Sequence, residues 1–106
     1  MALNKKNKLK GNKEFETVFK NGKALRGDFL LIKKADNGLE YSRFGISVSA
    51  KVSGKAVIRN RIKRILTEFI RTNIGKIGKG YDIVISVRAN RERTELIEDL
   101  EDLLVK

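Results

Sequence analysis

The stretch AVIRNRIKRILTEFIR, residues 56–71, combines an apolar side with a strongly cationic one. Seven of its sixteen residues are valine, isoleucine, leucine or phenylalanine, and five are arginine or lysine. On a helix that advances about 100° per residue, most of the apolar side chains fall on one broad stripe. The stripe consists of Ile58, Ile62, Ile65, Leu66, Phe69 and Ile70. We therefore predict a packed helix from about Ala56 to Thr72.

The side of this helix opposite the apolar stripe is cationic. It carries Asn60, Lys63, Arg64, Thr67 and Arg71, while Arg59 lies at one edge and Arg61 at the other, beside the single acid, Glu68. A solvated basic face is one interpretation. However, like charges on one face repel each other until a polyanion neutralises them, and the guanidinium group suits phosphate contacts. This face therefore favours nucleic-acid binding.

The rest of the composition limits the class of protein. The chain has 106 residues, enough for one domain, and a formal net charge of +11. Residues 1–91 carry 22 basic and 7 acidic side chains, whereas residues 92–106 carry 2 and 6. Cysteine and histidine are absent, which excludes disulfides, thiolate nucleophiles and imidazole chemistry. No stretch is apolar enough for a signal peptide or membrane span, so we expect a cytoplasmic protein without a membrane partner.

Patterns on both sides of the basic helix predict the remaining elements. Residues 1–11 read as a basic flexible arm, and residues 12–106 as a single α+β domain. A short helix follows Asn12, and strands at 28–35 and 39–51 flank Asn37-Gly38, which is a strong hairpin signal. A strand at 81–87 and a helix opening at Asn90 or Thr94 complete a mixed sheet of three to four strands with N- and C-terminal helices.

The strand predicted at 39–51 has two different faces. Phe44, Ile46 and Val48 alternate with Gly45 and Ser47, so one face is apolar and the other is small and polar. Such a floor leaves room for a ligand, although an ordinary solvent-facing side of a sheet is the alternative. The acidic residues lie on separate elements, and those of the last helix read as a soluble outer face. We therefore predict neither a catalytic residue nor a metal site.

The sequence resembles the protein subunit of bacterial ribonuclease P. The resemblance rests on SVSAKVSGKAVIRNRIKRILTEFIR (47–71), in which Arg59-Asn60-Arg61 is the most specific part. KLKGNKEFETVFKNG (8–22) resembles the first helix of the family, and GKGYDIVISVR (78–88) resembles its last strand. The alternatives are another small RNA-binding protein such as a ribosomal protein, a DNA-binding helix protein, and a metal-dependent nuclease acting alone.

The resemblance implies a noncatalytic subunit of an RNA enzyme. The RNA removes the 5′ leader of precursor tRNA with Mg²⁺ that is held mainly by the RNA, and no obligate protein partner is expected. The residues expected to contact the catalytic RNA are Lys55, Arg59, Asn60, Arg61, Lys63, Arg64 and Arg71. The residues expected to form a cleft for the leader are Phe15, Phe19, Ile32, Ser47, Ser49 and Lys51.

Two positions depart from the family pattern. Thr67 stands where the family commonly has an arginine, and Ile32 stands where some members have an aromatic residue. The resemblance also implies a left-handed strand–helix–strand connection around the basic helix. General rules of chain connection would instead predict a right-handed one.

Overall fold

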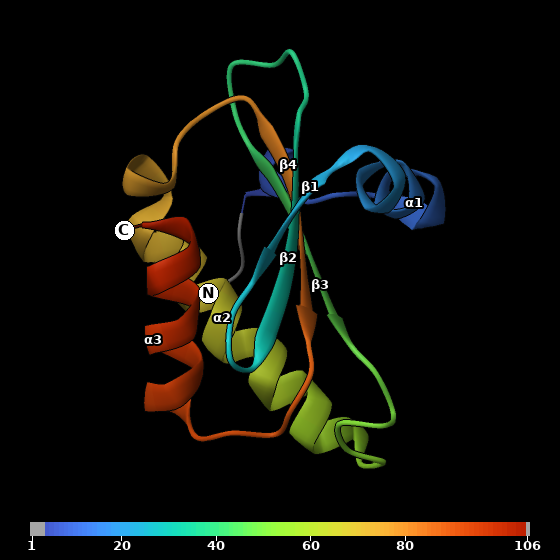
Figure 1. The fold of residues 1–106 in the computed structure, drawn as a ribbon, viewed down its shortest axis with the longest axis vertical. Coiled ribbons are helices and arrows are strands. Elements are labelled where there is room, and N and C mark those ends of the chain that lie inside the picture. Colours follow the sequence, from blue (N-terminus) through green and yellow to red (C-terminus); the bar gives the residue numbers. More distant parts are fainter. Residues whose placement is uncertain (1–3, 106) are drawn as a thin grey trace.

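A four-stranded sheet separates one helix from two others (Figure 1). The structure, a computed structural model, describes residues 4–105. α1 covers one face of the sheet, and α2 and α3 lie together on the other. The elements in chain order are a 3₁₀ turn η1 (Lys5–Asn7), α1 (Gly11–Asn21), β1 (Lys23–Arg26), β2 (Leu30–Asp36), β3 (Arg43–Val48), α2 (Ala56–Ile77), β4 (Tyr81–Val87) and α3 (Arg93–Leu104).

The strand order is β1-β2-β4-β3, which places β4 between β2 and β3. β4 runs antiparallel to β2 and parallel to β3. The prediction of a hairpin across Asn37-Gly38 is therefore wrong. β4 is buried on both faces, since Val84 packs against α1 while Ile83 and Ile85 pack toward α2 and α3. A strand of this kind is most stable in the interior of a sheet, with a partner along each edge.

The first strand, β1, is not predicted from the sequence. It has four residues, includes two cations and pairs with β2. The loop between them is held by Asp99 of α3, whose carboxylate accepts hydrogen bonds of 2.9 Å from the backbone N–H groups of Asp28, Phe29 and Leu30. Asp99 is buried, so the prediction of a soluble acidic outer face is wrong for this residue.

The main core lies between the sheet and the two helices α2 and α3. On α2, Ile62, Leu66 and Ile70 are buried, as the apolar stripe predicts, and Phe69 is buried as well. α2 runs one turn further than predicted, through non-helical backbone at Asn73. A second cluster, under α1, joins Leu9, Val18 and Val84 with the partly buried Phe15. The sheet is therefore covered on both faces.

Residues 4–10 lie against the edge strand β3. The Leu9 N–H donates to the Phe44 carbonyl at 2.9 Å, and the buried Asn7 side chain donates to the Ser42 carbonyl at 2.8 Å. This segment differs from the flexible arm predicted for residues 1–11, because the Leu9 side chain packs with Val18 and Val84 and the Asn7 amide bonds to the backbone just before β3. Residues 1–3 lie outside the described part of the chain.

The predicted fold class is confirmed: a single small α+β domain with three helices and a mixed sheet. α2 connects the parallel neighbours β3 and β4, so it is the crossover helix. The left-handed sense of this connection stays a prediction from the resemblance. Within residues 4–105 no helix combines the length and the apolar character needed to cross a membrane.

Candidate nucleic-acid interface

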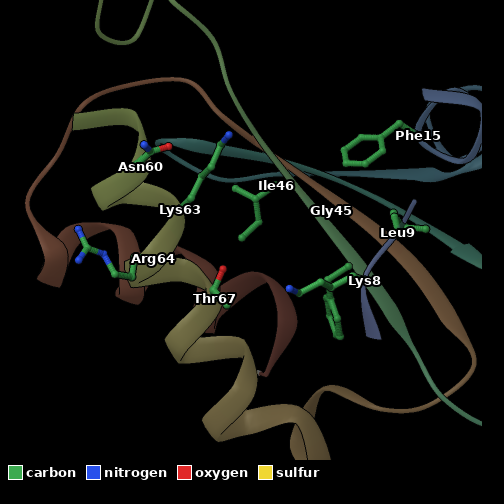
Figure 2. A pocket seen from close by; sticks show the side chains of 10 residues that line it. Lys8, Leu9, Phe15, Gly45, Ile46, Asn60, Lys63, Arg64 and Thr67 are labelled. Atoms are coloured by element: carbon green, nitrogen blue, oxygen red, sulfur yellow. The ribbon is translucent and has the colours of Figure 1, made fainter. Parts of the chain in front are cut away.

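The cationic side of α2 borders a hollow of about 540 Å³ beside the edge of β3 (Figure 2). Asn60, Lys63 and Arg64 are exposed along its α2 side, and Thr67 lies one turn further on. The remaining lining residues come from the N-terminal segment, α1 and β3: Lys8, Leu9, Phe15, Phe44, Gly45 and Ile46. This hollow, called here the edge hollow, therefore has an apolar floor and a cationic rim.

The other predicted RNA contacts on or beside α2 face different surroundings. Arg59 is half-buried and donates to the Ser53 carbonyl at 2.9 Å, which holds the loop before α2. Arg71 forms an ion pair of 2.6 Å with Glu68, and its hydrogen bond lowers the pKa of that carboxyl group. Arg61 faces the start of α3, and Lys55 is exposed just before α2. Of the seven predicted residues, three therefore share the edge hollow.

A second hollow, of about 320 Å³, lies over the sheet on the α1 side. It is called the sheet cleft here, and four predicted cleft residues meet in it: Phe19, Ser47, Ser49 and Lys51. Leu31, Val52, Ser86, Val87 and Arg88 complete its lining. Small hydroxyl side chains on β3 and β4 thus form a floor between one aromatic ring and two cations.

Ile32 does not belong to this cleft. Its side chain is fully buried among the core residues facing α2 and α3, so the prediction for Ile32 is wrong. Successive strand residues point to opposite faces, and the cleft side of β2 is formed by Leu31. The sequence reasoning also missed Ser86 and Arg88. The alternation along β4 could have indicated Ser86, once the register of β4 beside β3 was known.

The two predicted phenylalanines occupy different positions. Phe19 is 39% exposed at the sheet cleft, which leaves its ring free to stack against a base. Phe15 is partly buried over Gly45 and lines the edge hollow instead. Phe15 therefore lies where the α1 side of the sheet meets the α2 side.

Comparison with known proteins shows the family to which the chain belongs. Residues 3–106 match the family model described as Ribonuclease P. The chain belongs to the ribonuclease P protein family. It is 50% identical over 95 residues to a ribonuclease P protein component of Fusobacterium nucleatum, covering 90% of this chain and 83% of that protein. A ribonuclease P protein component of Picosynechococcus is 39% identical over 109 residues. That alignment covers 100% of this chain and 94% of the relative.

Solved ribonuclease P proteins share the fold. The protein from Thermotoga maritima, solved in complex with 1-(4-fluorophenyl)-2-thiourea, has a TM-score of 0.86 at 37% identity, covering 93% of this chain and 98% of that one. A Staphylococcus aureus ribonuclease P protein mutant with defective mRNA degradation activity has a TM-score of 0.86 at 29% identity, covering 94% and 86%. This chain is thus a protein subunit of ribonuclease P, an RNA-based tRNA-processing ribonuclease, and a partner of its RNA.

An ion-pair network holds α1 of this ribonuclease P protein over the sheet. Arg43 on β3 donates to Asp82 on β4 at 2.9 and 2.7 Å, and to Glu14 on α1 at 2.8 Å. Burial acts to raise the pKa of Asp82, but hydrogen bonds from Arg43 and Asn37 outweigh it, so that pKa lies below its usual range. The hydrogen bond with Asp82 and the contact with Glu14 raise the pKa of Arg43, although burial acts to lower it. The network therefore keeps its charges and fixes the position of α1.

Proposed function

We propose that this ribonuclease P protein binds two RNA segments with two surfaces and leaves the chemistry to the RNA. The outer side of α2, with Asn60, Lys63 and Arg64, binds the RNA subunit. The sheet cleft binds the single-stranded 5′ leader of precursor tRNA. The protein thereby assists Mg²⁺-dependent removal of the leader.

The observation that carries this proposal is the placement of the two surfaces. α1 lies on one face of the sheet and α2 on the other (Figure 1). The sheet cleft is on the α1 side, where Phe19 of α1 lines it. Opposite faces allow one small domain to contact a structured RNA and a flexible strand at the same time. The edge hollow lies between them and is lined by residues from both sides.

The chemistry of the sheet cleft suits a strand of variable sequence. The ring of Phe19 can stack on any base, and Lys51 and Arg88 can neutralise backbone phosphates. The serine floor provides hydroxyl groups without bulk. Stacking contributes about 1 to 3 kcal/mol per base whatever the base, as a protein that handles different leaders requires.

The side chains support a noncatalytic role for the protein. The chain has no histidine or cysteine, and residues 4–105 contain no cluster of three or more carboxylates that could hold a metal ion. The two acidic residues of the Arg43 network, Glu14 and Asp82, are each already paired with that arginine. We therefore propose that the RNA holds the Mg²⁺ ions and that the protein supplies binding energy.

A reconstitution experiment tests the proposal. Cleavage of precursor tRNA is measured in dilute Mg²⁺ with the RNA subunit alone, with the protein alone and with both. We expect cleavage to be weak with RNA alone, absent with protein alone and strong with both. Cleavage by the protein alone would contradict the noncatalytic assignment, and no stimulation by the wild-type protein would contradict the proposed assistance.

A further inference from the structure

A third surface, next to the edge hollow and apart from the sheet cleft, lies where α2 meets the start of α3. It consists of Arg61 on α2 with Arg91 and Arg93 on the segment that enters α3, and is called the α2–α3 arginine surface here. Two adjoining hollows, of about 490 and 400 Å³, both include Arg61 and Arg93 among their lining residues. Arg61 therefore shares one surface with two arginines that lie 30 and 32 positions further along the sequence.

The three arginines are free to bind an anion. All three are exposed, and among residues 4–105 none of them forms an ion pair within 4 Å. Arg91 is held over the ring of Phe29, with its guanidinium carbon 4.8 Å from the ring centroid. A cation stacked on an aromatic ring keeps its N–H donors available for a phosphate.

Two acids border this surface and reduce its charge. Glu92 lines the first hollow and Glu68 the second, and Glu68 is paired with Arg71 at 2.6 Å and also interacts electrostatically with Arg93. Arg64 lines the second hollow as well as the edge hollow, so the surface is continuous with the cationic side of α2. Cations therefore outnumber acids along the whole junction.

We infer that the α2–α3 arginine surface binds the phosphate backbone of the ribonuclease P RNA, as an extension of the contact made by α2. This inference rests on the proposed function, because Arg64 joins the two surfaces. The segment after β4 places its arginines on two different surfaces of the protein. Arg88 lines the sheet cleft on one side, while Arg91 and Arg93 lie on the α2 side, where the RNA subunit is expected.

The test measures binding of the wild-type protein and its variants to the ribonuclease P RNA alone, over a range of salt concentrations. In the double variant Arg91→Gln/Arg93→Gln, we expect the slope of log affinity against log salt to fall by about two units, and binding to weaken about fivefold near 0.1 M salt. Glu92→Gln, which removes a negative charge at the same place, should bind more tightly than wild type.

A control of equal charge separates a local contact from a general effect. Lys76→Gln/Lys79→Gln removes two exposed cations beyond the end of the α2 contact and should keep nearly the wild-type slope. Equal loss in both double variants, or loss with precursor tRNA but not with the ribonuclease P RNA, would overturn the inference. If Arg64→Ala weakens binding while the Arg91/Arg93 variant does not, this inference fails and the proposed role of α2 stands. If neither variant weakens binding, both this inference and the proposed role of α2 fail.

Discussion

The ring of Phe15 on α1 lies directly over Gly45 of β3, so close that a Cβ atom at position 45 would collide with the ring. Arg43, two residues earlier on the same face of β3, pairs with Glu14 of α1. The glycine and the arginine thus set the height and position of α1. Because Phe19 is on the same helix, they also determine where its ring stands over the sheet cleft.

Substitution of Gly45 by alanine should therefore displace α1. We expect a loss of about 1 to 3 kcal/mol in the free energy of unfolding from overpacking, measured by denaturant titration. Affinity for leader-bearing substrate should fall as well. Gly54→Ala is the matched control, because a Cβ atom there meets nothing within 4 Å. An unchanged stability for Gly45→Ala would show that α1 moves without cost.

Phe19→Ala tests the sheet cleft directly. Removing the ring should weaken binding of precursor tRNA to the reconstituted enzyme about tenfold while leaving binding of mature tRNA nearly unchanged. Leu39→Ala removes an apolar side chain of similar exposure, 37% against 39%, on the loop between β2 and β3. We expect no change for that control. Equal losses for precursor and mature tRNA would reject the leader contact of Phe19.

Thr67→Arg tests the cationic side of α2 by adding one positive charge to it. Thr67 lines the edge hollow beside Lys63 and Arg64, so an arginine there would meet the same RNA. Affinity for the ribonuclease P RNA should rise, and its salt slope should steepen by about one unit. Thr67→Gln provides a long neutral side chain as the control. A gain of the same size with glutamine would mean that packing, not charge, is responsible.

Asp99→Ala should destabilise the fold without removing a side chain that lines the edge hollow or the sheet cleft. The substitution leaves the N–H groups of residues 28–30 without their acceptor, at a cost of about 2 to 4 kcal/mol in the free energy of unfolding. Glu98→Ala, at the exposed neighbouring position, should change it by less than about 0.5 kcal/mol. Similar values for the two variants, by thermal or denaturant unfolding, would contradict the anchoring role of Asp99.

The Arg43–Asp82 pair should make stability depend on acid pH. The pKa of Asp82 is lowered in the folded protein, so the pair stabilises the fold above the unfolded pKa of about 3.9, and this stability is lost as pH falls through the lower folded pKa. The free energy of unfolding, measured from pH 7 to pH 2, should fall less steeply at the acid end for Asp82→Asn than for wild type. A parallel decline in both proteins would rule out this contribution.

Much of the fold and of the site follows from local patterns. The 3.6-residue period of residues 56–71 predicts which side of α2 is buried and which is cationic, because helix geometry depends on the helix alone. The alternation in β3 likewise predicts that Ser47 shares a face with Ser49 and Lys51. Family membership, too, is determined by the sequence.

Features that depend on contacts between segments distant in the sequence were decided only by the tertiary structure. Asn37-Gly38 favours a hairpin locally, but β2 and β3 each pair with β4 instead of with each other. The same pairing decides that Leu31, not Ile32, reaches the sheet cleft. Asp99 is buried because a loop 69 to 71 residues away presents three N–H groups to it. Sequence patterns report the preference of each segment, whereas these positions depend on which segments meet.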